Sequence, residues 1–320
     1  APRPDTAATM GPTAGALRRA TIVLLLSAII WGSMIPVLGA LAEQYDIWLL
    51  SGARYLLGLP ILWLAVHVSR PPAAAPGKLN WSRLLRLGAA MAGFSVFYTF
   101  GVAHTHPATA AIVLMCAPIW ATLLSRVMLG ATTPPGFFAT LVLVVVGGVI
   151  VVLGAPGRRA GSFGLEGGEI FLVIAQLSWS WYSIRAQQWL SDRGQIALSA
   201  LTSTVASVVL AVVCLVVWGA GGVVLPQRPP TLAEGAMIAW VGVFGVAVAV
   251  LLWNTGVSLV GVPVASLFGN SAPIFAIGIA TLFGHEPTGL QLLGGVIVLG
   301  GIAGLQLRQM RRARLRSTTP

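Results

Sequence analysis

Two copies of one stretch, held at a fixed spacing, constrain the fold of this chain more than any other feature of its sequence. Residues 98–121 align without gaps on residues 253–276, so each residue lies 155 positions before its counterpart. Both copies carry an Ala-Pro-Ile triplet, with the proline at Pro118 in the first and Pro273 in the second. If five membrane helices separate the copies, the second is inserted upside down relative to the first. Such inverted repeats occur in many carriers that alternate between the two sides of a bilayer.

Composition places the chain in a lipid bilayer. Of its 320 residues, 57% are hydrophobic and 8% are charged, and the mean hydropathy is +0.88. A soluble domain carries about 25% charged residues, so we interpret the chain as an integral membrane protein. Cys116 and Cys214 lie inside apolar runs and indicate buried small side chains rather than a disulfide. His104 and His106 alone are a weak zinc signal, and we expect neither a metal nor a cofactor.

Apolar segments of about 20 residues, the length that spans a ~30 Å hydrocarbon core, follow one another along the chain. They are residues 20–40, 47–68, 87–103, 108–129, 135–153, 170–187, 196–218, 236–253, 264–283 and 290–307. The alternating pattern of barrel strands is absent, and a helix satisfies its own backbone groups. We therefore predict an all-α integral membrane protein, with ten transmembrane helices arranged as two inverted five-helix repeats around a central cavity.

The repeat divides the chain into five predicted parts. These are a disordered cytoplasmic N-terminus (1–19), a first five-helix repeat (20–154), a joining loop (155–169), a second repeat (170–307) and a basic cytoplasmic tail (308–320).

The distribution of charge predicts the orientation. Ten spans place both termini on one side, and that side then carries fifteen Lys and Arg residues against three on the other. Positive charge accumulates on the cytoplasmic side, so we expect both termini there. The net charge of +11 gathers largely at helix ends, where it suits lipid headgroups. We therefore expect a lipid bilayer, and no nucleic acid, as partner.

Arg54 is the one charged side chain predicted to lie well inside a helix. It could bind a carboxylate or a phosphate of a substrate. It could instead snorkel toward the membrane surface or bond carbonyl groups of a neighbouring helix. Of the two, the structural role is the one we favour from the sequence.

Aromatic side chains near the middle of several predicted helices are candidates for the wall of a cavity. They are Trp31, Phe97, Tyr98, Trp179, Trp181, Tyr182 and Trp253. Such a wall suits planar or amphipathic solutes through stacking, and cations through the ring quadrupole. Ser33, Asn254 and Asn270 could meet the charges of a zwitterion. Ordinary aromatic packing between helices is the alternative for each ring.

Pro118 and Pro273 lie near the middle of two predicted helices. Each lacks a backbone donor and so frees the carbonyl four residues earlier, at Leu114 and Gly269. The break could serve as a bending point, as a ligand for substrate, or only as a packing feature. Because both copies keep the proline at one register, we predict hinges.

Several short motifs occur in an order and a repetition that resemble one family. They are Trp31-Gly32 in the first segment, Ala53-Arg54 in the second, and Ala117-Pro118 and Ala272-Pro273 in the fourth and ninth. Together with ten spans built as five plus five, they make residues 20–307 similar to the drug/metabolite transporter superfamily, EamA type. Gly284-His285-Glu286-Pro287 looks like that family's L-G-E-x segment, whereas the first copy has Ala131 where the acid usually stands.

The resemblance implies a basket of ten helices with a central cavity, and export from the cytoplasm across a bacterial inner membrane. The chain is most similar to family members that export aromatic amino acids. We therefore predict a secondary transporter that exports aromatic or apolar amino acids and related amphipathic metabolites by alternating access.

A proton-coupled exporter of cationic drugs from the same superfamily is the alternative. Such antiport usually needs a carboxylate at membrane depth, and the predicted helices have none in mid-span. An intramembrane enzyme is not expected, because the predicted helices have no paired carboxylates, no G-x-S-x-G turn and no mid-span His near a nucleophile. We expect a monomer, with a dimer through Gly147-Gly148 or Gly300-Gly301 as the alternative.

Overall fold

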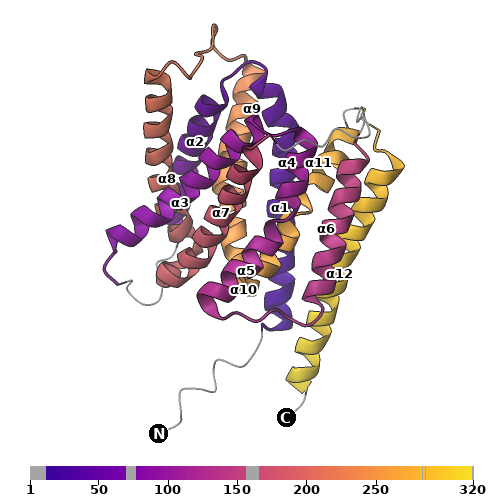
Figure 1. Cartoon of the computed structure of the whole chain (residues 1–320). Coiled ribbons are helices and arrows are strands. Elements are labelled where there is room, and N and C mark those ends of the chain that lie inside the picture. The colour runs from indigo at the N-terminus through magenta and orange to yellow at the C-terminus, as the bar shows by residue number, and fades with distance from the viewer. Residues whose placement is uncertain (1–11, 70–76, 156–165, 283, 285, 319–320) are drawn as a thin grey trace.

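The computed structural model describes most of the chain as a bundle of helices. The described residues are 12–69, 77–155, 166–282, 284 and 286–318. Every regular element in these ranges is helical, and the elements join into ten helical segments, which we call spans. Seven helices in the described ranges are long and apolar enough to cross a membrane. The beginning of α1 (Ala14–Ala42) and the last turns of α12 (Gly289–Thr318) lie at the same end of the bundle (Figure 1). We refer to this end as the terminal end.

The first half of the chain forms five spans, of which the fourth is broken. After α1 come α2 (Ile47–Val68), α3 (Trp81–Ala103), the two half-helices α4 (Pro107–Met115) and α5 (Ala117–Leu129), and α6 (Phe137–Leu153).

The second half also forms five spans, again with a broken fourth member. Its elements are α7 (Gly168–Trp189), the short η2 (Ser191–Arg193), α8 (Gly194–Gly219), α9 (Leu232–Gly242), the π-helical η3 (Val243–Val248), α10 (Ala249–Gly269), α11 (Ala272–Thr281) and α12. Gly261 lies inside α10 with φ 77° and ψ 163°, a conformation that glycine adopts readily. One span therefore ends and the next begins at Gly261.

The ends of the chain are more helical than the sequence indicated. We expected residues 14–19 to be disordered, but α1 begins at Ala14 and these residues are helical. The Thr13 hydroxyl accepts a hydrogen bond from the Ala16 N–H at 3.2 Å and caps the helix. α12 continues from the membrane segment through the basic tail to Thr318, and cations near a helix C-terminus are favourable. Residues 1–11, most of the expected joining loop, and His285 lie outside the described residues.

The two halves pack across each other rather than side by side as separate bundles. α3 packs on α7, and α1 packs on α10. The identical glycines of the repeat lie in these two contacts. A Cβ on Gly101 would lie 2.8 Å from the Leu172 side chain, and one on Gly256 would lie 2.3 Å from the Leu24 side chain. Equivalent positions of the two copies thus permit equivalent close helix contacts.

The glycine pair of α6 is used within the chain. A Cβ on Gly147 would lie 2.9 Å from the Gly294 carbonyl oxygen, and one on Gly148 would lie 2.5 Å from the Met115 sulfur. Small residues let helices approach closely in a membrane, and here they join α6 to α12 and α4.

Candidate functional site

Each half contains a span that is broken beside a proline, and the two breaks have the same hydrogen bonds. Backbone N–H groups bond the carbonyl three residues back instead of four, as in a 3₁₀ turn. The bonds are Cys116 to Val113 (3.0 Å) and Ile119 to Cys116 (2.9 Å) in the first copy, and Ser271 to Phe268 (2.9 Å) and Ile274 to Ser271 (3.0 Å) in the second. Every residue in one set has its counterpart 155 positions away in the other.

From the sequence we expected Pro118 and Pro273 to kink two continuous helices, and the structure differs from that expectation. Pro118 and Pro273 instead lie in the first turn of α5 and α11, after the break. Proline suits this position because the first turn of a helix does not use its N–H groups. Each span is therefore two half-helices that meet at a turn.

The two breaks touch each other through an amide side chain. Asn270 Nδ2 donates to the Met115 carbonyl oxygen at 2.6 Å. That oxygen lacks its usual donor, because the Ile119 N–H bonds Cys116 instead. Asn270 and Met115 are counterparts in the repeat, 155 positions apart.

On the terminal side of this contact the broken spans are packed together, and on the other side they separate. α5 packs against α10, whereas the described residues of α4 and α11 have no comparable contact. Of the residues 262–268 in α10, all but Pro263 are buried, while α11 has no buried residue. Figure 1 shows α4 and α11 toward the end of the bundle opposite the termini.

A cluster of aromatic rings lies beside the breaks. Trp31, Trp179 and Trp253 contact one another, with ring centroids 5.5 to 5.9 Å apart. Phe94 extends the cluster, with its centroid 5.1 Å from Trp179 and 5.6 Å from Tyr98. Trp253 is buried, and the other four rings are half-buried. We call these five residues the aromatic cluster.

Close packing of α1 on α11 holds Trp31 of the aromatic cluster next to the second break. A Cβ on Gly32, the residue after Trp31, would lie 2.5 Å from the Ala272 carbonyl oxygen. Ala272 is the first residue of α11, directly after the second break. The Trp31 indole N–H donates to the Gly245 carbonyl oxygen at 3.1 Å, which orients the ring.

A buried polar network lies on the terminal side of the aromatic cluster. Asn254 Nδ2 donates to the Tyr182 hydroxyl at 3.0 Å and to Ser199 Oγ at 2.9 Å. The Tyr182 hydroxyl lies 3.2 Å from Thr202 Oγ1. All four side chains are buried, and satisfied polar networks of this kind hold helices in one arrangement.

Arg54 is a half-buried cation with an incomplete set of partners. Nη2 donates to Ser95 Oγ at 3.2 Å, and the guanidinium carbon lies 5.9 Å from the Tyr55 ring centroid. Nε is buried and has no hydrogen-bond partner in the described part of the chain. Over the same residues the one ion pair joins Arg228 to Glu234, so Arg54 has no acidic partner there. Ser95 follows Phe94, which places Arg54 near the aromatic cluster.

Three of the sequence candidates lie elsewhere. Phe97 stacks on Phe171 at 6.3 Å, and Trp181 contacts Trp189 at 5.6 Å near the end of α7. Ser33 Oγ donates to the Ile30 carbonyl oxygen at 2.7 Å within α1 and accepts a hydrogen bond from the Trp240 indole N–H of α9 at 3.1 Å. We therefore leave Phe97, Trp181 and Ser33 out of the proposed site.

Sequence reasoning missed Phe94, Ser95 and the partners of Asn254. Phe94 had a usable signal, since it lies four residues before Tyr98 and so shares its helix face. Ser199 and Thr202 had none beyond being polar residues in an apolar helix. Their role depends on how α8 meets α7 and α10, which periodicity along one helix does not reveal.

A search of family models finds one described as "EamA-like transporter family", which matches residues 18–153 and 166–307. Among similar proteins is the "Probable terminal-alkyne amino-acid exporter" of Streptantibioticus cattleyicolor, 22% identical over 94% of this chain and 98% of its own length. The "Uncharacterized transporter YyaM" of Bacillus subtilis is 22% identical over 66% of this chain and 68% of its own. "Uncharacterized transporter YetK" of the same bacterium is 21% identical over 88% and 85%.

The fold is also found among solved structures. One crystal structure superposes with a TM-score of 0.75 at 18% sequence identity, and the match covers 92% of this chain and 98% of the other. At that identity the likeness shows a common fold and carries no statement about the substrate.

Proposed function

Because this chain belongs to the EamA-like transporter family, we propose that it exports aromatic or apolar amino acids and related amphipathic metabolites across the bacterial inner membrane. The observation that carries the proposal is the half-buried aromatic cluster beside two broken helices, with the incompletely bonded Arg54 next to it. Rings of this kind stack on flat or apolar side chains, and Arg is suited to a carboxylate. A relative named as a probable amino-acid exporter supports the same substrate class.

The charged part of an amino acid has partners on both sides of the aromatic cluster. Its carboxylate would bond the free Nε of Arg54. Its ammonium group would find carbonyl oxygens at the breaks, where Pro118 and Pro273 offer no N–H to Leu114 and Gly269. The side chain would lie against Trp31 and Trp179, with Asn270 at the contact of the breaks.

In the proposed mechanism the two halves are inverted repeats that rock about the contact between Asn270 and Met115. A contact between counterparts is what a two-fold relation between the halves produces, which supports the proposal. The broken spans are packed on the terminal side and apart on the other, as in a carrier open on one side. If both termini are cytoplasmic, that open side faces the periplasm, and the buried network around Asn254 closes the cytoplasmic side.

Efflux from proteoliposomes tests the function. Vesicles loaded with labelled Phe, Trp or Thr are followed with and without an imposed proton gradient. We expect saturable flux down the amino-acid gradient alone, faster for Phe and Trp than for Thr. Flux that appears only with the proton gradient would mean coupling. Absence of amino-acid flux in both conditions, together with proton-driven movement of a cationic dye, would replace the proposal with the drug-exporter alternative.

A further inference from the structure

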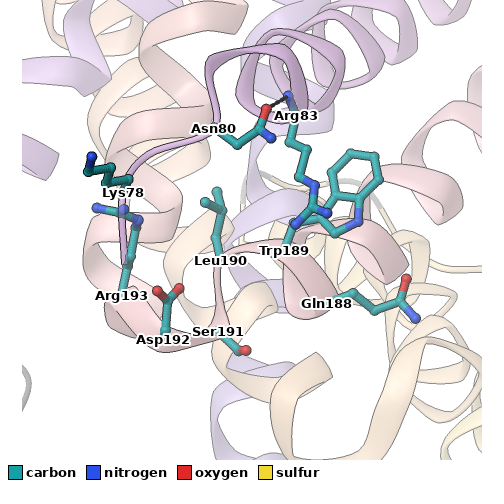
Figure 2. A pocket seen from close by; sticks show the side chains of 9 residues that line it. All are labelled: Lys78, Asn80, Arg83, Gln188, Trp189, Leu190, Ser191, Asp192 and Arg193. Carbon is teal, nitrogen blue, oxygen red and sulfur yellow. Dashed lines mark hydrogen bonds between the residues drawn. The ribbon is translucent and has the colours of Figure 1, made fainter. Parts of the chain in front are cut away.

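A polar pocket lies away from the aromatic cluster, where the beginning of α3 meets the end of α7 and η2. Its volume is about 240 Å³. It is lined by Lys78, Asn80, Arg83, Gln188, Trp189, Leu190, Ser191, Asp192 and Arg193 (Figure 2). Three basic side chains against one carboxylate leave the lining with a net positive charge.

Further cations gather on the same indole ring. The guanidinium carbons of Arg83, Arg86 and Arg185 lie 5.6, 5.3 and 5.5 Å from the Trp189 ring centroid. A ring face attracts a cation, but three guanidinium groups on one ring also repel one another. An anion between them would relieve that repulsion.

The described part of the chain supplies little to balance these charges. Asp192 is the one acid of the lining, and its Oδ2 already accepts a hydrogen bond from the Gly77 N–H at 3.3 Å. The ion pair of the described residues, between Arg228 and Glu234, involves no cation of the pocket. Arg193 donates to the Gly77 carbonyl oxygen, and Arg185 Nη1 donates to Gln188 Oε1 at 2.7 Å. Neither Lys78 Nζ nor the guanidinium of Arg83 has a hydrogen-bond partner among the described residues, and Arg185 Nε is buried without one.

We propose that this pocket binds the phosphate of an anionic membrane lipid. Guanidinium groups match the geometry of phosphate oxygens, and the start of α3 adds the positive end of a helix dipole. Basic pockets between membrane helices are known to take anionic headgroups. Exposed apolar side chains adjoin the pocket on α3, where Trp81 is 65% and Leu85 is 55% exposed. These two residues offer a surface for acyl chains, which a soluble phosphate would not need.

Thermal unfolding of the purified full-length protein in detergent tests the proposal without any transport. We would compare added phosphatidylglycerol, phosphatidylcholine and inorganic phosphate. The pocket variant is Lys78→Gln with Arg83→Gln. The matched control is Arg311→Gln with Arg312→Gln, which removes two exposed cations near the end of α12. We expect phosphatidylglycerol to raise the Tm of the wild type and the control, with an apparent affinity about tenfold lower in the pocket variant.

The outcomes separate the two sources of phosphate. An equal response of the pocket variant and the control to phosphatidylglycerol would overturn the proposal. A pocket-dependent response to inorganic phosphate that equals the response to phosphatidylglycerol would also overturn it, in favour of a soluble anion. If the double variant does not fold, Lys78→Gln alone is examined by counting retained lipid in native mass spectrometry, where unchanged retention contradicts the proposal.

Discussion

Trp179 is the residue on which the contacts of the aromatic cluster converge. Its ring lies between 5.1 and 5.9 Å from the rings of Trp31, Phe94, Tyr182 and Trp253. It is half-buried, so part of the ring is free to contact another molecule. Its position on α7, next to residues of α1, α3 and α10, makes it a junction between the halves of the chain.

Trp179→Ala is therefore expected to weaken substrate binding. Each aromatic pair contributes about 0.5–1.5 kcal/mol beyond burial, so the half-saturating concentration should rise about tenfold. The measurement is concentration-dependent efflux of Phe from proteoliposomes, and Tyr98→Ala should act in the same direction. Trp218→Ala is the control, because Trp218 is 51% exposed near the end of α8. If affinity and selectivity are unchanged in both Trp179→Ala and Tyr98→Ala, these rings only pack between helices and do not bind substrate.

Arg54 should discriminate substrates by their carboxylate. Arg54→Gln removes a charge-assisted contact of about 1.5–3 kcal/mol, so the half-saturating concentration for Phe should rise about 10- to 150-fold. Arg54→Lys should recover only part of this, because Lys lacks the planar fork. Phenethylamine, which has no carboxylate, should inhibit the efflux of labelled Phe with the same inhibition constant in wild type and Arg54→Gln. An equal loss for both ligands would instead indicate a structural role for Arg54.

At the scale of elements, the close crossing of α1 and α11 depends on Gly32. Gly32→Ala would force a methyl group to within 2.5 Å of a backbone carbonyl and 2.9 Å of the Phe275 Cβ. Overpacking of this kind destabilises by about 1–3 kcal/mol, and we expect a lower Tm in detergent. Gly39→Ala in the same helix is the control, since a Cβ there meets no atom within 4 Å. A Tm for Gly32→Ala equal to the control would show that the crossing is loose.

The breaks beside the prolines should control the rate of exchange more than affinity. Pro118→Ala or Pro273→Ala restores an N–H that can bond the carbonyl four residues earlier, which favours a continuous helix. We expect maximal efflux to fall severalfold while the half-saturating concentration changes little. Thr122→Ala is the control, because it changes a residue one turn after Pro118 but keeps the proline, so no backbone N–H is restored at position 118. Wild-type flux in both proline variants would rule out hinges.

The order of the helices was predictable because each span is long and apolar. The residues at which the helices begin and end were less predictable. α2 spans Ile47–Val68, the same residues that the apolar run indicated. The start of α1 was missed because Arg18 and Arg19 lie in its second turn, where they lower the hydropathy without opposing a helix. The proline positions were visible in the sequence, but the true break was not. A window of about 19 residues reads α4 and α5 as one helix.

The candidate site was predictable as a set of residue types and not as a set of contacts. Trp31, Trp179 and Trp253 meet although they come from three separate helices, and their mid-span positions pointed to them. Trp181 had the same kind of signal and lies with Trp189 instead. Two residues along a helix turn a side chain by about 200°, so the direction depends on which face of α7 packs on α3.

At the scale of the whole molecule, the proposed inversion of the halves makes equivalent loops lie on opposite sides of the membrane. The loop between the second and third spans precedes α3, and its counterpart between the seventh and eighth spans precedes α9. Figure 1 shows the beginning of α3 at the terminal end of the bundle and the beginning of α9 at the opposite end. Lys78 and Gln227 are exposed residues of the two loops, and Arg312 is an exposed residue of the terminal end.

Cysteine labelling from one side of the membrane tests the inversion and the orientation together. Lys78→Cys, Gln227→Cys and Arg312→Cys would each be made after Cys116→Ala and Cys214→Ala, and treated with a membrane-impermeant maleimide. The excess of positive charge at the terminal end predicts labelling at position 227 in intact cells, and at positions 78 and 312 only after permeabilisation. Labelling of 78 and 227 from the same side would contradict inverted repeats. Labelling of 78 and 312, but not 227, in intact cells would keep the inversion and reverse the orientation. The side on which α4 and α11 lie apart would then face the cytoplasm.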